Sequence, residues 1–246
     1  MKTYGTIGFP LTHSFSKQYF TEKIEREGIP ASAYYSFPLK SIDEFPEFLK
    51  NDPTLAGLAV TIPYKEQVLK YVTCLSEEVK QIGAANCIKV RGNVLTAYNT
   101  DIIGFEKSFA KNLKPHHKRA LVLGTGGASK AVQYVLKKLG IEFLVVSRNA
   151  PDADNFIEYQ EITPAIMKAY HLIVNATPLG MSPAEDTCPD LPYHLITADH
   201  YLFDLVYKPP KTLFLQKGEQ QGATVINGFE MLILQAEENW IRWNED

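Results

Sequence analysis

Two charged side chains are the strongest candidates for acid–base chemistry. Lys65 comes two residues after Pro63, which closes the apolar, strand-like run 55–62. A buried strand that ends in a turn holds the next side chains on a rigid support, and a partly desolvated lysine exchanges protons readily. Asp101 stands just before an expected helix, where its carboxylate could pair with the lysine or simply cap the helix. A solvated surface lysine is the simpler explanation, so the role of Lys65 depends on the residues around it.

Neutral polar residues occur at further expected junctions between strands and helices. Ser14 and Ser16 stand at the start of the first expected helix, Thr61 lies within the apolar run, and Asn86 follows two alanines. Such donors and acceptors suit a polyhydroxylated substrate, because hydroxyl groups are selected by satisfied hydrogen bonds rather than by apolar fit. Each has a structural alternative; Ser16, for example, is a suitable N-cap for the helix that follows.

The segment 124–129 is a glycine turn that follows the apolar strand 120–123 and opens a helix over 128–139. This context is typical of dinucleotide-binding proteins. Gly124 allows the tight turn, Gly126 lets the backbone approach a pyrophosphate, and the helix N-terminus offers free N–H groups. Ser129 replaces the usual third glycine, and a small residue there still permits close packing of helix on strand. The expected cofactor contacts in this segment are Gly124, Thr125, Gly126, Gly127 and Ala128.

The end of the next strand indicates which dinucleotide binds. An acid at that point would bind the ribose 2′-OH of NAD, whereas an arginine accommodates the 2′-phosphate of NADP. The strand ends in Ser147 and Arg148, with no acid, so NADP is favoured. Arg148 could instead stack on the adenine, which is compatible with either cofactor, or be a solvated surface residue.

The elements that must position these residues alternate between strands and helices, which indicates an α/β fold. In the first hundred residues, Gly92-Asn93 joins two strands as a tight hairpin, so the sheet there is mixed. The polar stretch 114–119, broken by a proline, is the best candidate boundary, and a purer β-α-β pattern follows it. We expect strands at 4–8, 33–37, 55–62, 87–91, 94–98, 120–123, 143–147, 172–175, 201–205 and 224–226, helices at 17–27, 42–50, 102–113, 128–139 and 229–243, and a long loop at 178–192.

The amino-acid composition does not indicate a particular class of binding partner. The net charge is −3 and the basic residues are spread along the chain, which argues against nucleic acid. No apolar run approaches a membrane span and the first residues do not resemble a leader, so we expect a cytoplasmic protein. The three cysteines lack C-x-x-C spacing, which favours reduced thiols over disulfides and predicts no metal site.

Taken together, these motifs closely resemble the shikimate dehydrogenase family. The resemblance runs in order from residue 5 to about residue 240, and several independent motifs that agree are more specific than any one. The matching segments are Ser14/Ser16, 60–66, 84–86, 99–101, 124–129, 175–181, 204–207 and 228–235.

The resemblance implies a reversible, NADP-linked reduction of 3-dehydroshikimate to shikimate in the chorismate pathway to aromatic amino acids. Lys65 would then be the acid/base and Asp101 its partner in the substrate site. Ser14 and Ser16 would hold the substrate carboxylate. The substrate hydroxyls would be bound by Thr61, Asn86 and Gln235, with Tyr207 near the nicotinamide and the substrate.

The resemblance also implies a two-domain α/β architecture. Residues 1–101 with 229–246 would form a substrate-binding domain with a mixed sheet, and residues 102–228 a Rossmann-like dinucleotide-binding domain. The C-terminal helix would return to the first domain, and the cleft would close around the ligands. The remaining cofactor-binding residues would be Ser147, Arg148, Thr177, Met181, Leu205 and Gly228.

Two positions depart from the family pattern. Lys17 replaces the usual proline after the second serine, and only Arg148 remains of a motif that usually carries two arginines. Two alternatives therefore stay open: a quinate/shikimate dehydrogenase that also uses NAD, and a catalytically silent sensor of NADP or a metabolite. The expected partner is a small-molecule substrate, and the protein would be a monomer or a homodimer.

Overall fold

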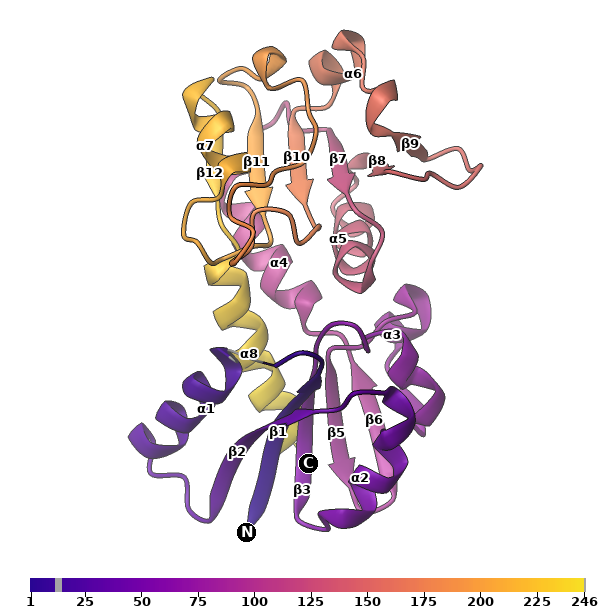
Figure 1. Ribbon diagram of the computed structural model, residues 1–246, viewed down its shortest axis with the longest axis vertical. Coiled ribbons are helices and arrows are strands. Elements are labelled where there is room, and N and C mark those ends of the chain that lie inside the picture. The colour runs from indigo at the N-terminus through magenta and orange to yellow at the C-terminus, as the bar shows by residue number, and fades with distance from the viewer. Residues whose placement is uncertain (12–14, 246) are drawn as a thin grey trace. The chain divides into compact units, whose positions relative to one another are not determined.

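The computed structural model describes residues 1–11 and 15–245, and the chain forms two compact units. One unit consists of Met1–Thr100 with Ala236–Asp246, and the other of Asp101–Gln235 (Figure 1). The polar stretch 114–119 lies inside the second unit, so the prediction of a boundary there is wrong. That stretch is only a connection into the next strand. Each unit is built around its own sheet.

The first unit contains a six-stranded mixed sheet in the order β2-β1-β3-β5-β6-β4. The inner strands β1 and β3 are parallel, whereas β5 and β6 form an antiparallel hairpin whose turn residue Gly92 has a φ of 57°. The predicted mixed sheet and hairpin are confirmed. The strands are β1 (Lys2–Gly8), β2 (Ser32–Pro38), β3 (Leu55–Val60), β4 (Cys74–Leu75), β5 (Cys87–Arg91) and β6 (Val94–Tyr98).

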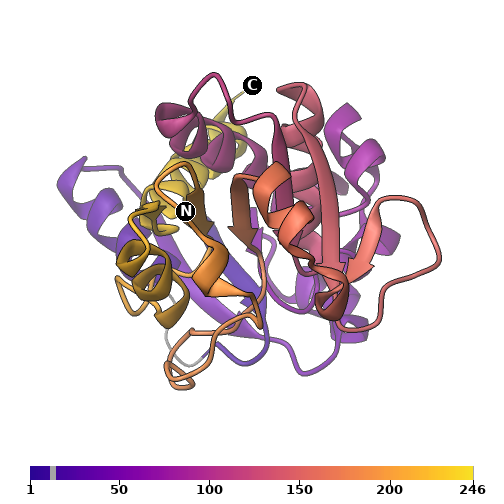
Figure 2. The ribbon, with the colours of Figure 1, turned by 90° about the horizontal axis from the view of Figure 1, so that it is seen from above.

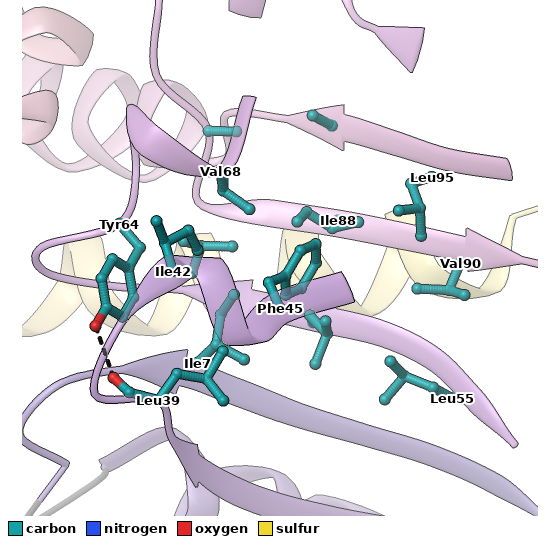
Figure 3. Packing of buried hydrophobic residues seen from close by; sticks show 14 of the residues in the cluster. Ile7, Leu39, Ile42, Phe45, Leu55, Tyr64, Val68, Ile88, Val90 and Leu95 are labelled. Carbon is teal, nitrogen blue, oxygen red and sulfur yellow. Dashed lines mark hydrogen bonds between the residues drawn. The ribbon is translucent and has the colours of Figure 1, made fainter. Parts of the chain in front are cut away.

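Both faces of this sheet are covered, which explains why every residue of β3 is buried and why its sequence is continuously apolar. Leu58 packs in a cluster with Phe45, Ile88 and Val68, much of which is drawn in Figure 3. The opposite cluster gathers around Trp243. The elements that supply these clusters are α1 (Phe15–Arg26), η1 (Ile42–Glu44), α2 (Phe45–Asn51), η2 (Gln67–Tyr71), α3 (Glu77–Ile82) and α8 (Phe229–Asn244).

The second unit has a six-stranded, wholly parallel sheet in the order β12-β11-β10-β7-β8-β9. The strand order reverses between β7 and β10, and the carboxyl ends of parallel strands at such a point form a ligand-binding crevice. Helices cover both faces (Figure 2). The strands are β7 (Arg119–Leu123), β8 (Glu142–Ser147), β9 (Phe156–Glu158), β10 (Leu172–Asn175), β11 (Tyr201–Asp204) and β12 (Thr224–Ile226). The helical segments are α4 (Asp101–Phe109), η3 (Ala110–Asn112), α5 (Gly127–Lys138), η4 (Tyr159–Glu161), α6 (Pro164–Ala169), η5 (Tyr193–Leu195) and α7 (Leu213–Gln220).

Four histidines line up at the amino-terminal edge of this sheet. Adjacent rings in the order His117, His116, His171, His200 lie 4.4, 5.5 and 5.3 Å apart between centroids. His117 and His200 are buried, and burial lowers the pKa of both. His200 accepts from the backbone N–H of Thr197 at 3.0 Å and faces the carbonyl of Met167 at 3.1 Å, which suits a neutral ring.

We therefore expect the protein to lose stability through these histidines as pH falls. Because their folded pKa values are depressed, the unfolded chain binds more protons below its ordinary pKa of about 6.5. The His200→Gln variant should show a smaller drop in melting temperature between pH 7.5 and pH 5.5 than the parent protein. The exposed His194→Gln is the control, since it should follow the parent protein. Identical pH profiles for His200→Gln and the parent would contradict the assignment.

Candidate active site

Lys65 stands on a short segment that is fixed at both ends. The preceding residue, Tyr64, is buried and its hydroxyl donates to the carbonyl of Leu39 at 2.6 Å (Figure 3). The carbonyl of Lys65 itself accepts from the N–H of Ala85 at 2.7 Å. The Lys65 side chain is half-buried, which separates it from the fully exposed surface lysines. The 3-10 helix η2 follows this segment and starts at Gln67.

Thr61 lies at the same end of the sheet as Lys65. Its N–H donates to the carbonyl of Ile7 at 3.0 Å, and its carbonyl accepts from Tyr64 at 3.0 Å. Gly8 makes room for it, because a Cβ at that position would lie 2.4 Å from the Thr61 methyl group. The strand expected over 55–62 ends at Val60, so Thr61 belongs to the turn and not to the ladder.

Asn86 is held by a buried chain of hydrogen bonds. Its Nδ2 donates to Thr100 Oγ1 at 3.0 Å, and Thr100 Oγ1 donates to Asn239 Oδ1 at 2.7 Å. The N–H of Thr100 donates to Asn86 Oδ1 at 2.6 Å. Backbone bonds tie Asn86 to Val60 and Tyr98, so the segment lies beside the end of β3. The structure thus brings Thr61, Lys65 and Asn86 to one edge of the first sheet.

Ser14 lies outside the described residues. Ser16 is in the first turn of α1, which begins at Phe15, so the prediction that it caps this helix from outside is wrong. Its hydroxyl interacts with the buried hydroxyl of Tyr34, which also bonds Thr6 Oγ1 at 2.6 Å. Burial raises the pKa of Tyr34, and it therefore stays a neutral hydrogen-bonding group.

Asp101 and Gln235 mark the two points at which the chain passes from one unit to the other. Asp101 is the first residue of α4 and is buried, as is Gln235 on α8. The helices approach closely at Gly104, where an added Cβ would lie 2.5 Å from the carbonyl of Met231 and 3.1 Å from Gln235 Cβ. Asp101 lies one helical turn before Gly104 on α4, and Gln235 lies opposite Gly104 on α8.

The glycine turn has the geometry that a pyrophosphate requires. Gly124 has a φ of 103°, and a Cβ there would lie 3.0 Å from the Thr177 methyl group. Gly126 is the N-cap of α5, and a Cβ on it would point into open space. The first turn of α5 holds no acidic residue, so the positive end of the helix dipole is left for an anion. Gly127 and Ala128 begin the helix, and Thr125 is exposed between the two glycines.

Ser129 does more than fill the place of the third glycine. It is fully buried, and its hydroxyl donates to the carbonyl of Gly124 at 2.6 Å while it accepts from Gln133 Nε2 at 3.0 Å. The hydroxyl therefore ties the first turn of α5 to the end of β7. A hydrogen bond here replaces the close backbone approach that a glycine would give.

Arg148 is exposed on the loop that follows β8. Ser147 Oγ shapes that loop by accepting from the N–H of Asn149 at 3.1 Å. A shallow hollow beside it is lined by Asp152, Glu158 and Glu161 among others. The exposed Arg148 is thus accessible to a phosphate group.

Four predicted cofactor residues follow β10, β11 and β12 on the same carboxyl edge. Thr177 bonds Asn175 Oδ1 through both its N–H, at 3.1 Å, and its hydroxyl, at 2.6 Å. Gly228 packs on Leu205, where a Cβ would lie 2.2 Å from the Leu205 carbonyl oxygen. Met181 is exposed on the loop after β10.

Tyr207 is half-buried three residues after β11, and burial raises the pKa of its hydroxyl. It therefore remains protonated at neutral pH and can donate a hydrogen bond. Among residues 1–11 and 15–245, no cluster of three potential ligands could hold a metal ion, and no helix is long and apolar enough to span a membrane.

Several residues that the sequence did not identify hydrogen-bond the predicted site residues or the loops that carry them. Asn239, Thr100 and Tyr34 hold Asn86 and Ser16, and Asp204 with Asn175 underlies the loops after β10 and β11. The sequence signal was present for Asn175, which ends the predicted strand 172–175, and for Asp204, the penultimate residue of the predicted strand 201–205. Asn239 carried no such signal, because it lies in the middle of a helix.

Comparisons with known proteins agree with this geometry. Residues 6–88 match the family model described as the shikimate dehydrogenase substrate binding domain. A protein of Caldicellulosiruptor saccharolyticus named shikimate dehydrogenase (NADP(+)) is 36% identical over 97% of this chain and 90% of its own length. The crystal structure of shikimate dehydrogenase 1 from Peptoclostridium difficile is 35% identical with a TM-score of 0.85 and covers 99% of this chain and 91% of its own.

A third match is the Thermus thermophilus shikimate 5-dehydrogenase in complex with NADP(H) and shikimate. It is 28% identical with a TM-score of 0.87, over 99% of this chain and 94% of its own. The similarity therefore extends through both units and is not limited to the substrate-binding half.

Proposed function

Because this chain belongs to the shikimate dehydrogenase family, we propose that it catalyses the reversible, NADPH-dependent reduction of 3-dehydroshikimate to shikimate. This is a step of chorismate and aromatic amino-acid biosynthesis. The observation that carries the proposal is 36% identity over 97% of the chain to a relative named for this NADP-linked activity.

Lys65 is the proton donor in this proposal. When bound, NADPH supplies the hydride that reduces the ring ketone. The Lys65 ammonium donates a proton to the oxygen that becomes the hydroxyl, and in the reverse direction the neutral amine accepts it. Asp101 is its polar partner in the substrate site. The support is the fixed backbone of Lys65, which limits the positions that its side chain can take.

The substrate shell consists of neutral groups around this lysine. Thr61, Asn86 and Gln235 bind the substrate hydroxyls, and Tyr207 contacts the substrate. Ser14 and Ser16 bind its carboxylate. The proposal is supported by the buried hydrogen bonds that orient Asn86 and Ser16, since a preoriented donor loses less entropy on binding.

The second unit binds the cofactor along the carboxyl edge of its sheet. The pyrophosphate lies at the N-terminus of α5, on the turn from Gly124 through Thr125, Gly126 and Gly127 to Ala128. Ser147 and Arg148 bind the adenosine end, and Thr177, Met181, Leu205 and Gly228 surround the nicotinamide. We thus propose a substrate-binding domain of residues 1–101 with 229–246 and a dinucleotide-binding domain of residues 102–228.

The Arg148→Ala variant is expected to raise KM for NADP⁺ by roughly tenfold while changing KM for NAD⁺ less than about twofold. The guanidinium can bond the 2′-phosphate, which NAD⁺ lacks. Initial rates with each cofactor at saturating shikimate measure both constants. Arg119→Ala, an exposed arginine on β7, is the matched control. Equal losses with both cofactors would show that Arg148 acts on the adenine or on the fold.

One observation favours broader specificity as a second candidate. Only Arg148 of the usual basic pair is present, and acidic side chains line the neighbouring hollow. Such a loop, with a single arginine, is compatible with a quinate/shikimate dehydrogenase that also accepts NAD. The silent sensor is the remaining alternative.

An absorbance assay at the nicotinamide band tests these functions. The proposed enzyme reduces NADP⁺ with shikimate faster than NAD⁺ with quinate. Comparable rates for the two pairs favour the broader enzyme, and binding without any turnover identifies a sensor. We further propose that the protein acts in the cytoplasm, which suits its three free thiols, on a small-molecule substrate and as a monomer or homodimer.

A further inference from the structure

A fully buried carboxylate lies beneath the loops that carry the predicted nicotinamide contacts. Asp204 is the last residue of β11 and has no exposed surface. It accepts hydrogen bonds from Asn175 Nδ2 at 2.9 Å, from the N–H of Val206 at 3.0 Å and from the hydroxyl of Thr212. These donors come from three segments, at the ends of β10 and β11 and at the start of α7.

Stability alone does not explain a charge at this position. Burial raises the pKa of Asp204 to about 6, so ionisation of this group at neutral pH costs folding free energy. Its folded pKa lies above the unfolded value of 3.8, so its contribution to stability is greatest at low pH and is lost as pH rises toward and past 6. Its three hydrogen-bond donors are a side-chain amide, a backbone N–H and a hydroxyl, and all three are uncharged. An amide would keep these hydrogen bonds without the cost of a buried charge, so the role of Asp204 lies in the segments that its hydrogen bonds join.

The hydrogen bonds of Asp204 join two loops on the cofactor edge. Through Asn175, which bonds Thr177 twice, Asp204 fixes the loop after β10. Through Val206 it fixes the loop after β11. The N–H of Leu205 also bonds the carbonyl of Asn175 at 2.9 Å, so the loops start side by side.

Other atoms at this point leave little room for either loop to shift. An added Cβ on Gly228 would lie 3.1 Å from the carbonyl oxygen of Asp204. On Gly180, whose φ is 86°, it would lie 3.2 Å from Thr212 Cβ. The backbone around Asp204 is therefore packed to contact, and a change in its side chain must be absorbed by the loops.

We propose that Asp204 is a positioning residue that holds the loops after β10 and β11 in the arrangement that receives the nicotinamide end of the dinucleotide. The inference rests on the proposed function for the identity of the cofactor. In a sheet of this strand order, β7 to β9 serve the adenosine half and β10 to β12 the nicotinamide half. Asp204 lies under the second half and touches neither cofactor nor substrate.

The hydrogen bonds of Asp204 predict different effects for substitution by asparagine and by alanine. Asparagine at this position keeps an oxygen for Asn175 and Val206, and its amide can donate to the Thr212 hydroxyl, which rotates to accept. Alanine leaves three buried donors without an acceptor and frees both loops. Asp204→Asn should therefore keep the loop geometry, whereas Asp204→Ala should lose it.

Steady-state kinetics on Asp204→Ala and Asp204→Asn test the inference. For Asp204→Ala we expect KM for NADP⁺ to rise at least about tenfold while KM for shikimate stays within about threefold. For Asp204→Asn both constants should stay within about threefold of the parent protein, and the melting temperature at pH 7.5 should be equal or higher. Asp186→Ala, an exposed acid on the loop after β10, is the control.

Three outcomes would overturn the inference: an unchanged KM for NADP⁺ in a folded Asp204→Ala protein, an equal rise in both KM values, or an Asp204→Asn protein as defective as Asp204→Ala. If Asp204→Ala does not fold, Asn175→Ala removes the side-chain hydrogen bonds that link the loops. The KM values for NADP⁺ and shikimate are then compared for that variant. If the parent protein does not oxidise shikimate, the proposed function fails. NADPH fluorescence titration of the same variants then still decides the inference, which expects weaker binding for Asp204→Ala alone.

Discussion

The Lys65→Met variant is expected to lower kcat for shikimate oxidation by at least about a hundredfold, because general acid–base groups contribute 10²- to 10⁴-fold to proton transfer. Methionine keeps the length of the side chain and removes the titrating group. KM for NADP⁺ should stay within about twofold, since the cofactor residues lie on another unit. Initial rates followed through nicotinamide absorbance measure both quantities.

The control for this prediction is Lys40→Met. Lys40 is exposed, and the same change there should leave kcat within about twofold. Circular dichroism and thermal melting of both variants establish that they are folded. Near-normal turnover by Lys65→Met would remove this lysine from the mechanism, and a large rise in KM for shikimate at unchanged kcat would assign it to binding.

Replacing Trp243 by alanine is expected to destabilise the protein by about 3–5 kcal/mol, or roughly 10 °C in melting temperature. Trp243 is fully buried, and its ring centroid lies 5.2 Å from that of Phe20 and 5.4 Å from that of Tyr4. It also lies against Gly57, where an added Cβ would approach its ring to 2.3 Å. The substitution therefore leaves a large cavity between α8 and the sheet of the first unit.

The neighbouring Ile241→Ala is the matched control, because Ile241 is 53% exposed on the same helix and should cost less than about 0.5 kcal/mol. Thermal and denaturant unfolding of the two variants provide the comparison. Equal stability of Trp243→Ala and Ile241→Ala would contradict the anchoring of the C-terminal helix on the first sheet. Because Asn239 lies on that helix, Trp243→Ala should also raise KM for shikimate.

Most strands of both sheets were predictable because their sequences are short, largely apolar runs that end at turn signals. The hairpin at Gly92 and the strand 172–175 agree with the structure, as does the long C-terminal helix. Elements of two to eight residues were missed: β4, β9, α3, α6 and α7. In such short segments a helical or alternating period cannot repeat often enough to be recognised.

The boundary between the units could not be predicted from local composition. The stretch 114–119 has the composition of a linker, yet the chain divides at Thr100 and Asp101. There a buried threonine bonds Asn239, which is 139 residues away in the sequence. Pairing over such a separation is decided by the tertiary fold, and local composition does not reveal it.

The residues of the candidate site that belong to sequence motifs were predictable. The residues that hold them in place through hydrogen bonds were not. The glycine turn predicted an anion site because it lies between an apolar strand and a helix, and the structure adds the serine hydroxyl that replaces its third glycine. Lys65 was ambiguous from its neighbours, and the family resemblance gave it a role. Asp204 and Asn239 act through other residues, so only their hydrogen bonds reveal them.

The most direct test of the account is the fate of the hydrogen at the carbinol carbon of shikimate. The protein is incubated with NADP⁺ and shikimate deuterated at the carbon whose hydroxyl is oxidised. We expect the deuterium to appear on the reduced nicotinamide, one for each 3-dehydroshikimate formed, and the reaction to require Lys65. Cofactor binding with no reduction of NADP⁺, or deuterium released to water, would contradict it.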